Sequence, residues 1–331
     1  MSDKITLSNT TNAINQSGFF LQTHVVYQLK KQHWTVNTEM PVQLAPFLED
    51  PLKNPIHFTR PSGPIFEPSN LIQSIFASQN KIELEETSID VIGIASSSDD
   101  KLSFLLCIEC KKLDPEYVDW IFFDVKSKQP MNLIAKNIVS QGFVSLFKIP
   151  PTTKKSNEIH VDLNKFNWDP FKHPHSNSSL AISNEKLDKN TYKTKKSLVD
   201  NASRQIIKGM YGLILNKLQH QILTGDGYEN FTEIFVPIVV TTANLKICKA
   251  NPEDIDPKTG YTTKEPEYEN VDSIIFECLP PKSVKFPHPE FNSLSLEHRY
   301  ALLKWHVLIL SPNGFVKFLN DLKTTSLVSP R

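Results

Sequence analysis

The order of apolar and polar residues along the chain predicts an alternation of helices and strands. Apolar positions at helical spacing predict a helix over residues 18–32 and a longer one over 198–223. Shorter helical stretches are expected at 72–77, 115–121, 132–140, 294–305 and 313–322. Compact apolar or alternating runs predict strands at 34–42, 88–95, 102–110, 142–149, 231–242, 245–250, 273–279 and 306–310.

This order of elements predicts an α/β protein with a mixed sheet flanked by helices. Residues 1–16 are expected to form a flexible arm, and residues 17–250 the main domain. Within that domain, residues 114–197 contain many Pro, Ser, Asn and Lys residues and are interpreted as an insertion, at least partly extended. Residues 251–331 are expected to be a C-terminal extension packed on the same core.

The segment from Ser88 to Lys112 carries the most informative chemistry. It reads as two apolar strands joined by a polar turn, with Asp90 near the start and Glu109 and Lys111 near the end. Because strand residues alternate between faces, Glu109 and Lys111 point the same way. If the two strands pair as a hairpin, Asp90 approaches the same edge. Two carboxylates and a lysine at the rim of a sheet are suited to holding a hard divalent cation beside a phosphodiester.

The pattern of Asp90 followed by Glu109-x-Lys111 resembles the PD-(D/E)XK superfamily of restriction-endonuclease-like nucleases. The order of elements around the triplet is similar to that of the superfamily core, although Ile89 stands where many members have proline. The resemblance implies a restriction-endonuclease-like mixed sheet and hydrolysis of DNA phosphodiester bonds, with a role in restriction or phage defence. It implies Mg²⁺, replaceable by Mn²⁺, bound by Asp90, Glu109 and the Cys110 backbone carbonyl. Lys111 would position the attacking water.

The resemblance also directs attention to two helices. On the second long helix, Gln205 would contact nucleic acid or the catalytic water, and it shares a helical face with Asn201 and Lys208. On the first helix, where superfamily members often carry a metal-binding Glu, Gln22 and His24 are the nearest polar residues. An exposed polar face with no role in chemistry explains both helices equally well or better.

Charge is balanced over the whole chain, with 36 basic and 36 acidic residues, but it is unevenly distributed. The segment from Lys186 to Lys208 contains seven basic and only two acidic residues. The segment from Glu253 to Glu277 contains eight acidic residues and only two lysines. The basic segment is a candidate phosphate-binding surface, and both segments could equally be solvated loops. The candidate DNA-binding residues there are Lys193, Lys195, Lys196, Arg204 and Lys208.

The four cysteines lie in apolar runs, which predicts buried free thiols and a reducing, cytoplasmic environment. No apolar run approaches the length of a membrane span, so no membrane partner is expected. The resemblance implies DNA as the partner, and a homodimer is a further possibility. Two other classes remain open. One is a catalytically inactive nuclease-like module that binds nucleic acid or protein. The other is an unrelated α/β protein in which Asp90 and Glu109 are surface charges.

Overall fold

The structure of the chain is a computed structural model. It describes residues 18–44, 85–97, 102–114, 116, 118–124, 134–138, 173–177, 181–186, 192–195, 197–224, 231–278, 305–323 and 327–328. The expected arm at 1–16, the helix at 72–77 and the strand at 142–149 lie outside these residues. The helix expected at 294–305 does so too, apart from Trp305, which begins a strand.

The larger of two sheets has nine strands and mixed direction. Its main path runs in the order β1 (Thr35–Leu44), β2 (Glu85–Ser97), β3 (Leu102–Lys111), β9 (Phe231–Thr241), β13 (Trp305–Leu310), β12 (Ser273–Cys278) and β6 (His175–Asn177). Two strands lie off this path: β5 (Ile134–Ile138) pairs with β9, and β14 (Leu327–Val328) pairs with β2. The strands β1, β2 and β3 are antiparallel neighbours, whereas β3 and β9 are parallel.

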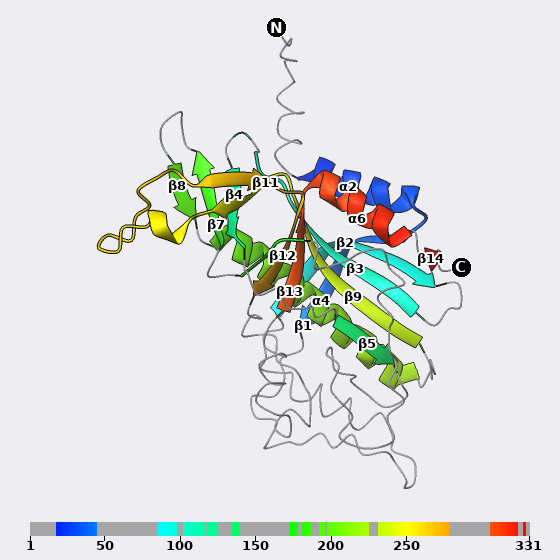
Figure 1. Cartoon of the computed structure of the whole chain (residues 1–331). Helices are drawn as coiled ribbons and strands as arrows, with labels where there is room; N and C mark the ends of the chain where they lie inside the picture. Colours follow the sequence, from blue (N-terminus) through cyan, green and yellow to red (C-terminus); the bar gives the residue numbers. More distant parts are fainter. Residues whose placement is uncertain are drawn as a thin grey trace, which may run out of the picture.

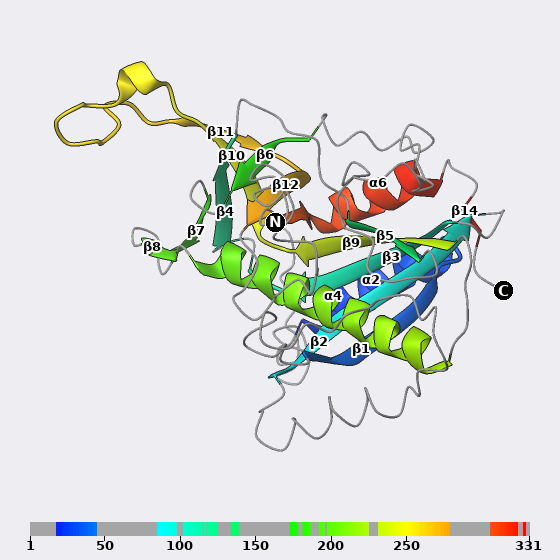
Figure 2. The same ribbon diagram turned by 90° about the horizontal axis from the view of Figure 1, so that it is seen from below.

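The smaller sheet has five strands, which come from separate parts of the chain. Its order is β11 (Glu267–Asn270), β10 (Asn244–Lys249), β4 (Val118–Phe123), β7 (Ala181–Lys186) and β8 (Tyr192–Lys195). A short 3-10 helix, η4 (Pro252–Asp254), lies in the long connection between β10 and β11. That connection and β11 project away from the body of the molecule (Figures 1 and 2).

Helices cover both faces of the larger sheet. The helices α2 (Phe19–Lys31) and α6 (Pro312–Lys323) lie side by side on one face, and α4 (Ser197–Thr224) crosses the other (Figures 1 and 2). Two buried clusters correspond to the two faces, one beneath α4 and one beneath α2 and α6. Three layers of this kind result when a sheet is apolar on both sides.

One pair of chain segments runs through both sheets. The parallel ladder between β3 and β9 extends over ten residue pairs, from Leu102 opposite Thr232 to Lys111 opposite Thr241. A few residues later the same two segments pair again as β4 and β10, also in parallel. Between the ladders, Thr242 holds the segments together, because its hydroxyl contacts both the N–H and the C=O of Leu113. The smaller sheet therefore continues from the centre of the larger one.

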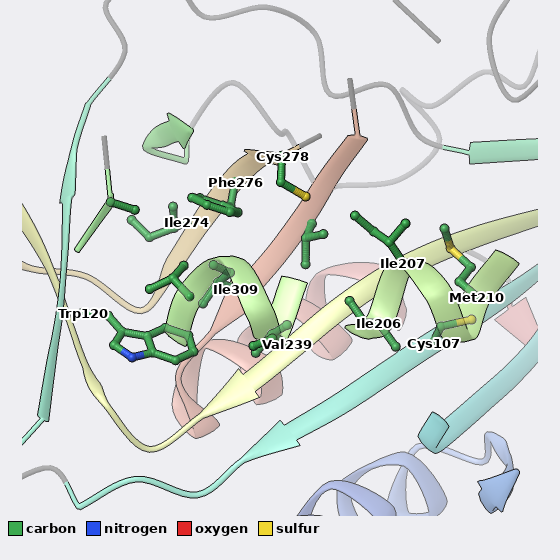
Figure 3. Close-up of a cluster of buried hydrophobic side chains, with 14 of the residues drawn as sticks. Cys107, Trp120, Ile206, Ile207, Met210, Val239, Ile274, Phe276, Cys278 and Ile309 are labelled. Atoms are coloured by element: carbon green, nitrogen blue, oxygen red, sulfur yellow. The ribbon is translucent and has the colours of Figure 1, made fainter. Parts of the chain in front are cut away.

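The core under α4 joins the two sheets. Ile206, Ile207 and Met210 of α4 belong to one buried cluster with Cys107 of β3, Val239 of β9 and Trp120 of β4 (Figure 3). Phe122 of β4 and Phe276 of β12 meet edge to face with ring centroids 6.2 Å apart. The burial of these side chains fixes α4 against both sheets at once.

The mixed α/β class expected from the sequence is confirmed, and two local assignments are wrong. The expected helical turn at 115–121 is limited to one turn, closed by the Val118 N–H donating to the Asp114 carbonyl, and β4 begins at Val118. The helix expected at 132–140 is replaced by strand β5, which pairs with β9. The strand β4 pairs with β10 and β7, and β5 pairs with β9, all distant in the sequence, and this pairing outweighs local preference.

The segments interpreted as an insertion and an extension both contribute to the sheets. Residues 114–197 supply β4, β5, β6, β7 and β8, and residues 251–331 supply β11, β12, β13, β14 and α6. The cysteines match expectation, because all four are free thiols and only Cys110 is more than slightly exposed. In the part of the chain that the structure describes, no helix is both long and apolar enough to cross a membrane.

Gly209 allows α4 to approach β2 closely. A Cβ at this position would lie 2.6 Å from Cγ1 of Ile89 and 3.5 Å from the carbonyl oxygen of Ser88. The absence of a side chain therefore sets the spacing between the helix and the strand that carries Asp90. Gln205 lies one turn earlier on the same helical face, so this spacing also sets the height of Gln205 above the sheet.

Gly209→Ala is expected to destabilise the protein by about 1–2 kcal/mol, because the overpacking cost exceeds the roughly 1 kcal/mol that alanine normally gains over glycine within a helix. Chemical denaturation measures the change. Asn201→Ala, at an exposed position of the same helix, is the control and should be neutral or slightly stabilising. A stabilised Gly209→Ala variant would contradict the close approach.

Candidate active site

The candidate site lies where β2 and β3 stop pairing with each other. Their ladder ends at Val91 opposite Ile108. Beyond this point β2 continues along β1, and β3 continues along β9 through Glu109 and Lys111. Asp90 and Glu109 are therefore the first residues of the two strands after they part. We call this place the fork.

At the fork, β1 and β2 both depart from the regular alternation of side chains between the two faces of the sheet. Residues an even number of positions apart in a regular strand lie on the same face. In β1, however, Val36 packs in the cluster beneath α2 and Met40 in the cluster beneath α4. In β2, Ile89 and Ile92 are three apart and share the α4 cluster. Glu39 lies between Val36 and Met40 and has a left-handed backbone with φ of 49°.

Asp90 replaces the missing ladder contacts with two hydrogen bonds that each join a side chain to the backbone. One of its carboxylate oxygens, Oδ2, accepts the Cys110 N–H at 2.7 Å. Its backbone carbonyl accepts the side-chain amide of Gln22, on α2, at 3.0 Å. Gln22 was identified as a nearby polar residue of the first helix, and the structure places it on the backbone of Asp90 rather than on its carboxylate. Asp90 thus has a structural role at the fork whatever its chemical role.

Glu109 is buried beneath α4 with one oxygen paired and one unpaired. Its side chain is 2% exposed, and Oε1 lies 2.5 Å from Nζ of Lys111. Nζ of Lys111 also donates to Oε1 of Gln205 at 3.0 Å. The other oxygen of Glu109, Oε2, is buried and has no hydrogen-bond partner. An unpaired buried carboxylate oxygen is costly, which makes this atom a ready ligand for a cation.

Burial raises the pKa of both acids, and the charge of a neighbouring carboxylate adds to the rise in each case. The pKa of Glu109 rises to about 7, first because of burial and second because of the charge on Asp90, while Lys111 opposes the rise. The pKa of Asp90 is also raised by burial, against the Cys110 N–H and Lys111. A single lysine does not compensate one buried and one half-buried carboxylate at this place. A bound cation would, because it favours the ionised form of each acid.

The oxygens at the fork fit a hard divalent cation. Asp90 and Glu109 supply carboxylates, and Mg²⁺ needs only one or two of these because it keeps several waters. The N–H and C=O of one strand residue point to the same edge, so the Cys110 carbonyl faces the edge where its N–H meets Asp90. Among the described residues, no three His, Cys, Asp or Glu side chains form a metal-binding group.

The structure brings together some of the expected site residues but not all. Asp90, Glu109, Lys111 and Gln205 meet at the fork. Arg204 instead pairs with Asp200 on its own helix, Nε to Oδ2 at 2.6 Å. Lys208, half-buried, lies one turn after Gln205. Of the remaining lysines, Lys193 and Lys195 belong to β8, and Lys196 lies outside the described residues.

Glu39 is the acidic residue that sequence reasoning missed. It lies between Thr38 and Met40, which pair with Val91 and Ile89, so its position is opposite Asp90. Its charge contributes to the raised pKa of Asp90. The side chain is exposed. The only signal in the sequence was an acid within the strand expected at 34–42, and pairing that strand with Asp90 required knowing the register across residues 45–84.

Comparison of the chain with protein-family models, curated proteins and solved structures finds no match.

The shifted pKa of Glu109 predicts a specific pH dependence of stability. Because the folded state holds this proton more tightly than the unfolded state, the stabilisation is complete below about pH 4.5 and is lost as the pH rises through about 7. Glu109→Gln cannot ionise. Relative to the wild type in EDTA, this variant should gain up to about 3 kcal/mol of stability between pH 4.5 and 8.

Urea unfolding at several pH values measures this gain. Glu265→Gln, at an exposed position, is the control and should follow the wild-type profile. Parallel profiles for wild type and Glu109→Gln would show that the Glu109 carboxyl is not destabilised in the folded protein.

Proposed function

We propose that this protein is a divalent-cation-dependent nuclease that hydrolyses phosphodiester bonds in DNA, with the fork as its active site. The observation that carries the proposal is the buried Glu109, which has one oxygen on Lys111, the other unpaired, and a pKa raised by burial and by the charge of Asp90. Asp90, Glu109 and the Cys110 carbonyl would hold Mg²⁺ or Mn²⁺. When bound, such an ion lowers the pKa of a bound water and screens the phosphate charge.

The residues of the chain have separate tasks in this proposal. Lys111 places a positive charge beside the carboxylates, where it can orient a water and stabilise the negative charge that develops on the phosphate. Gln205 accepts a hydrogen bond from Lys111 and so fixes the direction of its ammonium group. Gln22 and the Cys110 N–H hold Asp90 from two sides. These contacts keep the charged groups in place before substrate arrives.

The order of elements supports the same class of nuclease. A helix, three antiparallel strands, a helix and a strand parallel to the third make up the sequence α2, β1, β2, β3, α4 and β9. This is the order expected of the restriction-endonuclease-like core, with β4 to β8 inserted before α4. The acids of the Asp90 and Glu109-x-Lys111 pattern lie on the second and third of these strands, as the resemblance requires.

A second candidate is a nuclease-like module that has lost catalysis and binds nucleic acid or protein. The observation that favours it is the engagement of both acids by the protein itself, Asp90 with the Cys110 N–H and Glu109 with Lys111. The two candidates differ in one measurable property. In an active site, the two carboxylates exchange these contacts for a metal ion. In an inactive module, the carboxylates keep these contacts and no ion binds.

Glu109→Gln and Lys111→Ala are each expected to lower divalent-dependent cleavage of DNA by about 100-fold or more, because each removes transition-state stabilisation. The assay is cleavage of supercoiled and linear DNA with Mg²⁺ or Mn²⁺ in excess. Lys112→Ala is the matched control, because Lys112 is the adjacent exposed lysine and does not share the face of Lys111.

Calorimetric titration with Mn²⁺ separates the two candidates. The proposed nuclease binds the ion in the wild type and loses binding in Glu109→Gln. A wild type that neither binds Mn²⁺ nor cleaves DNA or RNA would contradict the nuclease and favour the inactive module.

DNA binding tests the basic residues separately from cleavage. Lys208 lies near Gln205 and is expected to contact phosphate, so Lys208→Ala should reduce the slope of log affinity against log salt by about 0.9 for duplex DNA. Replacing Lys193, Lys195 and Lys196 together by Ala tests the more distant lysines. An unchanged slope in either variant would show that those residues do not contact the DNA.

A further inference from the structure

The two edge strands of the smaller sheet carry opposite charge. Among the described residues, β11 pairs only with β10 and β8 only with β7, so each leaves one side of its backbone unpaired. All four residues of β11 are exposed, and they include Glu267 and Glu269. The strand β8 carries Lys193 and Lys195. Unpaired strand edges are templates for pairing with another chain.

The register across the sheet places these acidic and basic positions on one face. Residues directly opposite each other in neighbouring strands share a face. Glu269 is opposite Ile247 of β10, which is in turn opposite Phe122 of β4. Lys195 is opposite Ser183 of β7, which is in turn opposite Trp120 of β4. Trp120 and Phe122 are two apart in β4 and lie on the same face. Positions 267, 269, 193 and 195 therefore all fall on the face that carries Trp120.

The strand directions are also compatible with pairing between copies. The strand β11 is antiparallel to β10, and β10 is parallel to β4. The strand β8 has the direction of β4, because two antiparallel steps separate them through β7. If a second copy continues the sheet in the same orientation, its β8 meets β11 of the first copy as an antiparallel neighbour.

We propose that this protein associates with itself head to tail through the smaller sheet, with β11 of one copy against β8 of the next. In the register of Glu267 opposite Lys195, Glu269 is opposite Lys193, so both cross-strand pairs join opposite charges. Pairing of like edges would instead place Glu opposite Glu or Lys opposite Lys, which is unfavourable. Glu269 already pairs with Lys249 at 2.7 Å, but both side chains are more than half exposed and this pair lies at the open edge.

The contact is heterologous, so it generates a ring or an open chain of copies rather than a symmetric dimer. The strands are short and the residues of β11 are exposed, so the association is weak and sensitive to salt. It rests on the smaller sheet alone and does not depend on the nuclease activity proposed for the fork.

Sedimentation velocity of the full chain, from low micromolar to near-millimolar concentration, tests the association at low and at high salt. The wild type is expected to show a rising weight-average mass at low salt that falls at high salt. Two charge-reversed variants provide the decisive comparison. Glu267→Lys with Glu269→Lys makes both edges basic, and Lys193→Glu with Lys195→Glu makes both edges acidic.

Neither variant should self-associate, but an equimolar mixture of the two should, because each edge then finds the opposite charge. Cooperative melting of both variants verifies that the fold is intact. The proposal is overturned if the wild type remains monomeric at all concentrations, or if the mixture behaves as the sum of its parts. A third outcome also overturns the proposal. If Lys193→Glu with Lys195→Glu loses DNA binding but keeps the mass distribution of the wild type, β8 binds nucleic acid and not a second copy.

Discussion

The parallel pairing of β3 with β9 is the constraint on which the rest of the structure depends. Both strands are buried on both faces, by α4 on one side and by α2 and α6 on the other, so their ten residue pairs cannot shift without exposing two cores. The same two segments then form the centre of the smaller sheet. The pairing of β3 with β9 continues to Lys111, whereas the pairing of β3 with β2 ends just before Asp90. The fork forms because β3 remains paired on one side only.

The fork concentrates an electrostatic imbalance at one place. Elsewhere, ion pairs such as Lys246 with Asp119 are partly exposed and balanced. At the fork, two carboxylates share one lysine beneath a helix, and burial raises the pKa of both. A protein selected only for stability would gain by replacing Glu109 with an apolar residue. A partly unpaired acid in such a position is typical of a functional site.

Local pattern predicted the part of the site that depends on one strand or one helix. Alternation correctly placed Glu109 and Lys111 on one face, and helical spacing put Gln205 on the polar side of α4, from which it reaches Lys111. The change of faces at Glu39 and Asp90 was not predictable in this way. It depends on how β1 and β2 pair across residues 45–84, and no local signal encodes that register. The helical turn expected at 115–121 fails for a related reason, because pairing with β7 and β10 imposes a strand from Val118 onward.

The long separation between the paired segments has a consequence for how the protein matures. Leu113 and Thr242, which join β3 to β9, are 129 residues apart, and Lys111 and Gln205 are 94 apart. Such contacts close late and make folding slow. On the ribosome, a nascent chain that ends before Phe231 contains Asp90, Glu109, Lys111 and Gln205 but lacks the strand that fixes β3. The arrangement of side chains at the fork therefore cannot be completed during synthesis until β9 has emerged.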